Sequence, residues 1–279
     1  MNLVTILKEI EKVDDEEYGR LNPRREAIKQ FKGLAKKLTI AAVPVAAGSL
    51  FKQAYAQTPT VDVEAVLQFA LKLEYLEAEF YTRALAAPAL IPAGADLAAI
   101  SNISQHENQH VAVLISLLQA QEITPIVKPT FDFSGGKGSG TGPFADVFSN
   151  YTTFLTLAQI FEDTGVRAYK GQLAELIGDA ATLTTVLNIH SVEARHASHI
   201  RQMRKVQGAD IKPWVTNNVS GIDAAVLPTY EGEDSDIQGG IKITGINGLA
   251  ISAATATEAF DEPLTSVQVL AIVDLFIVS

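Results

Sequence analysis

The feature that most constrains this chain is a four-residue pattern, Glu-x-x-His, that occurs twice in long helical segments. Glu107 and His110 form the first copy, and Glu193 and His196 form the second. Residues three apart share one face of an α-helix, so each copy directs a carboxylate and an imidazole to the same side. A single copy is a weak signal, because glutamate is common. Two copies in corresponding helices are far more specific and predict helices that face each other across a polar site.

Four segments of the chain show the hydrophobic periodicity of helices and are bounded by proline or glycine. Short first and third connections predict two antiparallel helical hairpins. A linker of roughly twenty residues, which contains the glycine-rich run 134–142, joins the hairpins as a long middle crossover. The alternative is a flexible linker between two independent hairpins. The predicted helices span about 61–86, 96–121, 144–177 and 179–206.

The first and third helices also match each other. Glu74 is followed seven residues later by Tyr81, and Glu162 is followed seven residues later by Tyr169. Seven residues are about two helical turns, so each glutamate shares a face with its tyrosine. Because the two hairpins repeat the same pattern, we expect a site with a pseudo-two-fold axis.

Four inward glutamates and two histidines predict a site for two metal ions. Four carboxylates balance two divalent ions, whereas buried carboxylates without such partners are costly. The chain has no cysteine, so its ligands are nitrogen and oxygen atoms, which suit iron, manganese or zinc. Glu77 is a substitute for Glu74, and its counterpart in the third helix is Gly165. The predicted metal ligands are Glu74, Glu107, His110, Glu162, Glu193 and His196.

Tyr81 and Tyr169 are the candidate catalytic residues. They are interpreted either as hydrogen-bonding or redox neighbours of the metals or as large core residues with a satisfied hydroxyl group.

This arrangement resembles the ferritin-like superfamily of di-iron and di-manganese carboxylate proteins over about residues 60–206. The resemblance implies an all-α fold, a ferritin-like four-helix bundle with a long crossover between its second and third helices. It also implies that Glu107 and Glu193 bridge two iron or manganese ions. Glu74–Leu85 and Ala259–Leu264 resemble exported ferritin-like domain proteins that are related to desiccation-associated proteins.

His106 adds a second possible motif, because His-Glu-x-x-His is also the zinc site of some metalloproteases. No third ligand follows at a familiar spacing, and Val192 stands where a matching histidine would precede Glu193. His106 is therefore expected on the helix surface or beside the site. His190 and His199 could also line the site, or could be partly exposed.

Residues 1–56 have the composition of a targeting segment. Arg24 and Arg25 precede the uncharged run 38–51, which is too short for a comfortable membrane span. The small-x-small sequence Ala54–Ala56 follows. The segment resembles a twin-arginine export signal, which predicts a periplasmic or extracellular protein without stable membrane insertion after cleavage. The formal net charge of −10 argues against a nucleic-acid partner.

Residues 57–206 are thus predicted to form the bundle, and residues 207–279 a mostly irregular C-terminal extension. A strand is expected near 241–243 and a last short helix over about 266–276. Three functions follow from the site: a di-metal oxidase, peroxidase or catalase-like enzyme acting on oxygen or peroxide, a metal-binding stress-protection protein without turnover, or a metal-free bundle. The last of these predicts that Arg167, Arg195 or Lys72 neutralises the glutamates. A homo-oligomer is possible in each case.

Overall fold

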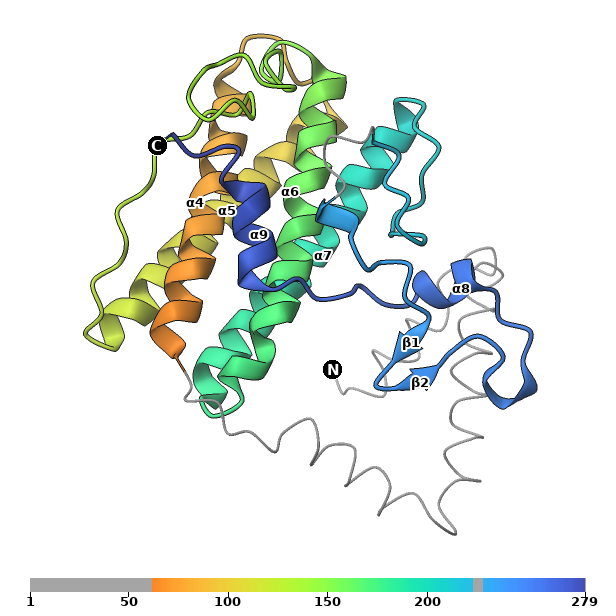
Figure 1. The fold of residues 1–279 in the computed structure, drawn as a ribbon. Coiled ribbons are helices and arrows are strands. Elements are labelled where there is room, and N and C mark those ends of the chain that lie inside the picture. The colour runs from red at the N-terminus through yellow and green to blue at the C-terminus, as the bar shows by residue number, and fades with distance from the viewer. Residues whose placement is uncertain (1–61, 223–227, 279) are drawn as a thin grey trace, which may run out of the picture. The chain divides into compact units, whose positions relative to one another are not determined.

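The computed structural model describes residues 62–222 and 228–278, so the predicted targeting segment 1–56 lies outside the described residues. The described chain is mostly helical and ends in an extension that is largely irregular (Figure 1). The prediction of an all-α bundle with such an extension is confirmed. The elements are α4 (Val63–Ala86), α5 (Ala95–Ala120), α6 (Tyr151–Gln172), the 3-10 helix η1 (Leu173–Leu176), α7 (Ala180–Val206), β1 (Ile237–Gln238), β2 (Ile241–Lys242), the 3-10 helix η3 (Ile246–Gly248), α8 (Ala253–Thr257) and α9 (Ser266–Val273).

Helices α4 and α5 pack along their length as one antiparallel hairpin, and α6 and α7 form the other (Figure 1). Aspartate side chains begin two of these helices. Asp62 accepts a hydrogen bond from the backbone N–H of Ala65, and Asp179 accepts from those of Ala181 and Thr182. Such caps satisfy N–H groups that have no partner inside the helix. Helices α4, α5 and α7 start and stop within two residues of the predicted limits.

The third helix is shorter than predicted. It begins at Tyr151 rather than directly after Pro143, and it gives way to η1 after Gln172. Asn150 sets the start, because its side chain accepts hydrogen bonds from the N–H groups of Thr152 and Thr153. Residues 144–149 form turns instead. The apolar spacing in this stretch reflects turns that are packed on the core, which periodicity alone does not separate from a helical turn.

The crossover from α5 to α6 covers residues 121–150, longer than the predicted twenty or so. It is folded onto the bundle, unlike a flexible linker. The carboxylate of Asp132 accepts hydrogen bonds from the N–H groups of Ser134, Gly138 and Gly140. Phe133, on the other side of the loop, is buried in the core. The glycine-rich run is thus a compact turn held by one aspartate.

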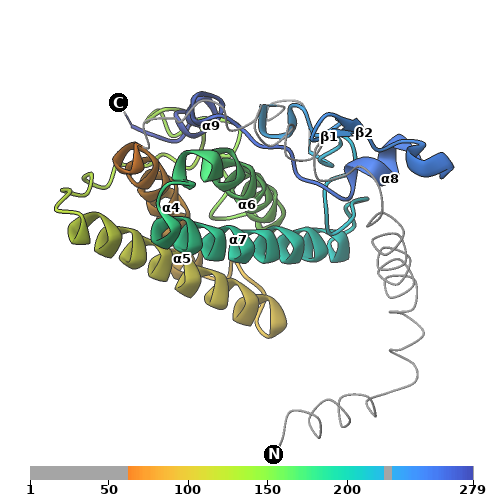
Figure 2. The same cartoon turned by 90° about the horizontal axis from the view of Figure 1, so that it is seen from below.

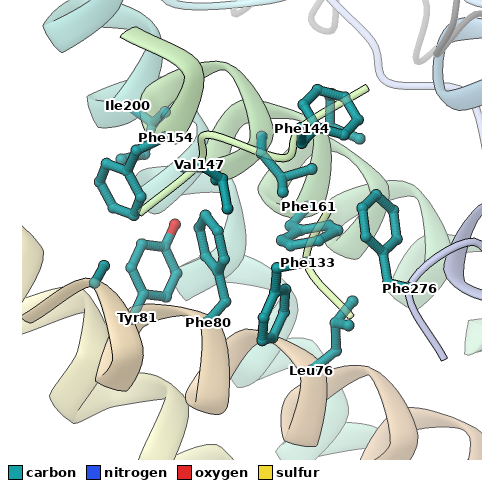
Figure 3. Close-up of a cluster of buried hydrophobic side chains, with 14 of the residues drawn as sticks. Leu76, Phe80, Tyr81, Phe133, Phe144, Val147, Phe154, Phe161, Ile200 and Phe276 are labelled. Carbon is teal, nitrogen blue, oxygen red and sulfur yellow. The ribbon is translucent and has the colours of Figure 1, made fainter. Parts of the chain in front are cut away.

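An aromatic cluster fills one side of the bundle (Figure 3). The ring of Phe80 stacks on Phe154 at 5.1 Å and meets Phe161 edge-on at 5.1 Å. The crossover contributes Phe133, and the end of the chain contributes Phe276, whose ring lies 4.9 Å from Phe161. Offset and edge-to-face pairs at these distances add to the stability that burial alone supplies. Segments far apart in sequence therefore share one core.

The C-terminal extension covers the α6 side of the bundle, and α9 lies on the side of α4 and α6 (Figure 2). This covering explains why α6 is buried on nearly every face. Two buried arginines anchor the extension. Arg167 donates to the carbonyls of Thr229 and Glu262, and Arg201 pairs with Asp163, which also accepts from Tyr230.

The predicted strand at 241–243 is confirmed as β2, which pairs with β1 in a short antiparallel hairpin. Helix α9 ends at Val273 rather than at 276, because the chain turns there to bring Phe276 into the core. A capping box between Thr265 and Gln268 begins α9. Among the described helices, none combines the length and the apolar character that crossing a bilayer requires.

Candidate metal centre

The structure brings the six predicted ligands together in the middle of the bundle, one glutamate from α4, one from α6, and a Glu-x-x-His pair from each of α5 and α7. The four glutamates have no exposed surface, and the two histidines are nearly buried. The side chains form two groups whose ligand atoms all lie within 4.8 Å of one another. Both groups contain Glu107 and Glu193. The first adds Glu74 and His110, and the second adds Glu162 and His196.

The two imidazoles point the same nitrogen at the carboxylates. Nδ1 of His110 lies 3.1 Å from an oxygen of each of Glu74, Glu107 and Glu193. Nδ1 of His196 lies 2.7 Å from Oε1 of Glu107 and 3.4 Å from a second carboxylate. One nitrogen carries at most one proton, so it cannot satisfy three oxygens. The donor atoms instead converge on common points, as ligands around a cation do.

Unpaired oxygens test whether this donor set fits a metal. Both oxygens of Glu193, Oε1 of Glu107 and Oε2 of Glu162 are buried without a hydrogen-bond partner among the described residues. Oε1 of Glu107 is close to Nδ1 of His196, but their relative orientation does not make a hydrogen bond. Buried polar atoms are normally paired. Carboxylate and imidazole donors with free lone pairs fit iron or manganese.

The pKa values of the clustered residues also fit a site for cations. Burial raises the pKa of Glu74 to about 7. Burial would also raise the pKa of Glu107, but the adjacent imidazoles of His110 and His196 outweigh it and lower that pKa to about 2. Burial opposes a charge on His196, yet the surrounding carboxylates raise its pKa to about 11. The carboxylates thus hold protonated imidazoles as they would hold metal cations, and metal binding must release those protons.

A protein-family model described as a ferritin-like domain matches residues 62–206, more than half of the chain. The chain belongs to the ferritin-like domain family. No curated protein matches it. The matched range runs from the residue before α4 to the last residue of α7. The matched range therefore contains all four helices that supply the six clustered side chains.

The two tyrosines of the ferritin-like domain contact the site crosswise. The hydroxyl of Tyr81 on α4 donates to Oε1 of Glu162 on α6, at 2.5 Å. The hydroxyl of Tyr169 on α6 donates to Oε1 of Glu74 on α4. Each tyrosine thus donates its hydrogen bond to the glutamate of the other hairpin, although it shares a helix face with the glutamate of its own helix. Burial, followed by the nearby carboxylate charge, raises the pKa of both hydroxyls well above the usual range.

Glu77 is also buried beside the site, although it belongs to neither ligand group. Burial, then the charge of Glu193, raises its pKa well above the usual range. Glu74, the predicted ligand, lies 3.1 Å from Nδ1 of His110, whereas no ion pair among the described residues joins Glu77 to a histidine. Sequence reasoning treated the two residues as alternatives, whereas the structure buries both. The spacing of three, which places both on one face, was the available signal.

A pocket of about 630 Å³ opens between α5 and α7 and reaches the site at His196. His106 lines this pocket, and its Nδ1 lies 2.9 Å from Nε2 of His196. The two rings stack, with centroids 5.2 Å apart. His106 is therefore an exposed residue that contacts a predicted ligand, and it joins neither ligand group. A zinc protease site would need both His106 and His110 as ligands, so the position of His106 outside both groups argues against the protease interpretation. His199 lines the same pocket, whereas His190 does not.

The prediction of a metal-free bundle required a lysine or arginine among the glutamates. Arg167 instead pairs with Glu233 of the extension, at 2.8 Å. Within the described residues, no ion pair joins Arg195 or Lys72 to the six side chains. In this ferritin-like domain the histidines are the only described cationic partners of the clustered carboxylates.

Proposed function

We propose that this chain is an exported ferritin-like protein that holds two iron or manganese ions and uses them in redox chemistry on oxygen or peroxide. The observation that carries the proposal is the pair of ligand groups that share Glu107 and Glu193. A carboxylate has two oxygens and can bind two neighbouring ions at once, so shared carboxylates suit a dinuclear centre. The remaining ligands divide between the two positions, Glu74 with His110 and Glu162 with His196.

A bound iron or manganese pair would supply the redox chemistry at oxygen or peroxide. The residues around it have separate tasks. Tyr81 and Tyr169 orient Glu162 and Glu74 by hydrogen bonds, and burial raises the pKa of both hydroxyls further above neutral pH, so both remain hydrogen-bond donors. The aromatic cluster around Phe80 excludes water from one side of the site. We therefore propose Tyr81 and Tyr169 as the residues that control the ligands next to the metals.

The pocket between α5 and α7 supports access by a small molecule. Its volume of about 630 Å³ lies within the range of ligand pockets in proteins, about 300–1,000 Å³. His196 forms part of its wall, so a molecule in the pocket is next to one predicted ligand. Oxygen and peroxide are far smaller than this opening, and a somewhat larger reducing substrate also fits.

Elemental analysis after reconstitution tests the metal centre. The purified chain is loaded with iron(II) or manganese(II) and desalted, beside a Glu107→Ala, Glu193→Ala double variant and a Glu79→Ala control. Glu79 lies on α4 and pairs with Arg83 and Lys128 away from the site. We expect about two ions per chain in the native protein and the control, and almost none in the double variant. A native protein that retains no metal contradicts the proposal.

A second candidate is metal binding without turnover, as in a stress-protection or desiccation-related protein. The complete burial of the four glutamates favours it, because it restricts access to the His196 side. Peroxide consumption by the metal-loaded protein separates the two functions. Catalytic consumption that the double variant lacks supports the redox enzyme, whereas stable metal binding with no more consumption than free ions supports the second candidate.

Export is proposed from the sequence of residues 1–56. Replacing Arg24 and Arg25 by lysine in the full chain should stop transport by a twin-arginine pathway, with the protein retained in the cytoplasm. Cell fractionation followed by immunoblotting measures this. Unchanged export of the double-lysine variant would show that another route, or none of this type, is used.

A further inference from the structure

The pairwise match between the two hairpins breaks at one buried position. Glu74 and Glu162 correspond, but the residue three places after each differs, Glu77 on α4 and Gly165 on α6. Glu77 is only 3% exposed, and its Oε2 has no hydrogen-bond partner among the described residues. An unpaired buried carboxylate is costly, and each such group in a protein needs an explanation. No lysine or arginine in the described part of the chain pairs with Glu77.

The missing side chain of Gly165 makes room for two carboxylates. A Cβ atom built on Gly165 would lie 3.2 Å from Oε2 of Glu193 and 3.3 Å from Oε1 of Glu77. The two oxygens therefore flank the same point, on the face of Glu193 that the histidines do not contact. Oε2 of Glu193 also has no hydrogen-bond partner. Two ionised carboxylates beside the same point in a buried site repel strongly, and either a proton or a nearby cation relieves that repulsion.

We infer that Glu77 is a seventh side chain of the metal centre and supplies a fifth carboxylate beside Glu193. This inference rests on the proposed dinuclear site. With neutral imidazoles, four carboxylates balance two divalent ions, whereas five carboxylates balance one divalent and one trivalent ion. Glu77 therefore strengthens binding of the ion pair and favours its oxidised form. Because Gly165 offers no matching group, the two ion positions are not equivalent.

Metal affinity in a charge-removing variant tests this role. Manganese(II) binding is titrated at equilibrium in the native protein, in Glu77→Gln and in the control Glu79→Gln. Glutamine keeps the shape of the side chain and cannot become a buried charge, so the variant should fold at least as well. We expect at least one ion to bind about tenfold or more weakly in Glu77→Gln, with Glu79→Gln unchanged.

The outcomes separate this inference from the proposed function. Two ions bound by Glu77→Gln with both dissociation constants within twofold of native overturn the role of Glu77 and leave the dinuclear site standing. A native protein that binds no manganese or iron overturns both. As a second variant, Gly165→Ala introduces the Cβ atom that would press on both carboxylates. It should weaken metal binding without unfolding the protein, since alanine favours the helix more than glycine does.

A reduction potential distinguishes a ligand from a packing residue. A carboxylate near the ions stabilises the trivalent state more than the divalent state, and an amide does so far less. Direct electrochemistry of the iron-loaded protein should therefore show an upward shift of the potential in Glu77→Gln relative to native and Glu79→Gln. An unchanged potential together with unchanged affinity would assign Glu77 to packing alone.

Discussion

At the scale of single residues, the crossed tyrosines link the two hairpins through the site itself. Tyr81 and Tyr169 each donate a hydrogen bond to a carboxylate on the other hairpin. Both tyrosines and both acceptors are buried. A hydroxyl removed from such a pair leaves a buried acceptor unsatisfied, so the loss exceeds the net contribution of an ordinary hydrogen bond.

We expect Tyr81→Phe to lower the free energy of unfolding of the metal-free protein by about 1–3 kcal/mol. Tyr169→Phe should cost a similar amount, because its hydroxyl makes the corresponding contact with Glu74. Urea denaturation measures both. Tyr75→Phe, at a half-buried position on α4, is the control and should be nearly neutral. Two site variants that are as stable as the control would show that the hydroxyls do not hold the carboxylates.

The ionisable residues of the site predict how stability depends on pH. The raised pKa of Glu74, about 7, means that the folded state keeps a proton which the unfolded state releases above about 4.5. Stability therefore falls as pH rises through this window. The stabilising charge of His196, with a pKa of about 11, is complete below its unfolded pKa and is lost as pH rises towards 11. Glu107 has the opposite effect, because its pKa is lowered to about 2. Its contribution to stability increases as pH rises from about 2 and is nearly complete above about pH 4.5.

The melting temperature of the metal-free protein should thus decrease from about pH 5 to about pH 9. Manganese(II) in excess should reverse this trend, because metal ions compete with protons for the same atoms. Thermal unfolding followed by circular dichroism, with chelator or with manganese, measures both curves. A metal-free protein that becomes more stable across this range would contradict the assigned burial of these groups.

At the scale of elements, α6 is the helix on which the molecule depends, because the bundle covers one side of it and the C-terminal extension covers the other. At Gly171 the backbone of α6 lies directly against the backbone of the extension. A Cβ atom at this position would lie 2.0 Å from the carbonyl oxygen of Leu264. Leu264 also donates its N–H to the carbonyl of Arg167, which holds the extension against the helix.

Gly171→Ala should therefore lower the free energy of unfolding by about 1–3 kcal/mol, as in other overpacked sites. The sign is informative, because alanine would otherwise stabilise a helix by about 1 kcal/mol over glycine. Thr152→Ala, on the exposed first turn of α6, is the matched control for helix propensity. Limited proteolysis of residues 253–278 should also accelerate in Gly171→Ala alone. A variant more stable than native would show that the extension can move away without cost.

At the scale of the whole molecule, the end of the chain returns to the crossover and closes the core. Phe276 packs on Phe161, and its carbonyl accepts the N–H of Asp132. Val278 donates to the carbonyl of Thr130 in the same way. The extension is therefore part of the core that supports the site, and the four helices do not form a complete unit without it.

Phe276→Ala should cost about 3–5 kcal/mol in the free energy of unfolding, since it removes a fully buried aromatic ring. Val267→Ala on α9 is the control, because Val267 is 76% exposed and should change stability by less than about 0.5 kcal/mol. Chemical denaturation gives both values. Equal effects of the two substitutions would mean that the C-terminal segment contributes little to the core.

The sequence by itself determined most of the helix limits and which residues share a helix face. Helix periodicity and the spacing of three are local properties, so Glu107 with His110 and Glu193 with His196 could be placed on common faces without knowledge of the fold. The repeated pattern of a glutamate followed seven residues later by a tyrosine then identified Glu74 and Glu162 as the other two predicted carboxylate ligands. The start of α6 was missed because the cap at Asn150 and the turns before it share the composition of a helix start.

Only the tertiary structure decided which groups from different elements satisfy one another. The crossed contacts of Tyr81 and Tyr169, the contact of His106 with His196, and the burial of Glu77 in the space left by Gly165 all depend on how neighbouring helices are rotated. The pairing of Arg167 with the extension depends on residues more than sixty positions away. Such contacts have no sequence period, because they are set by packing between surfaces and by the need to pair every buried charge.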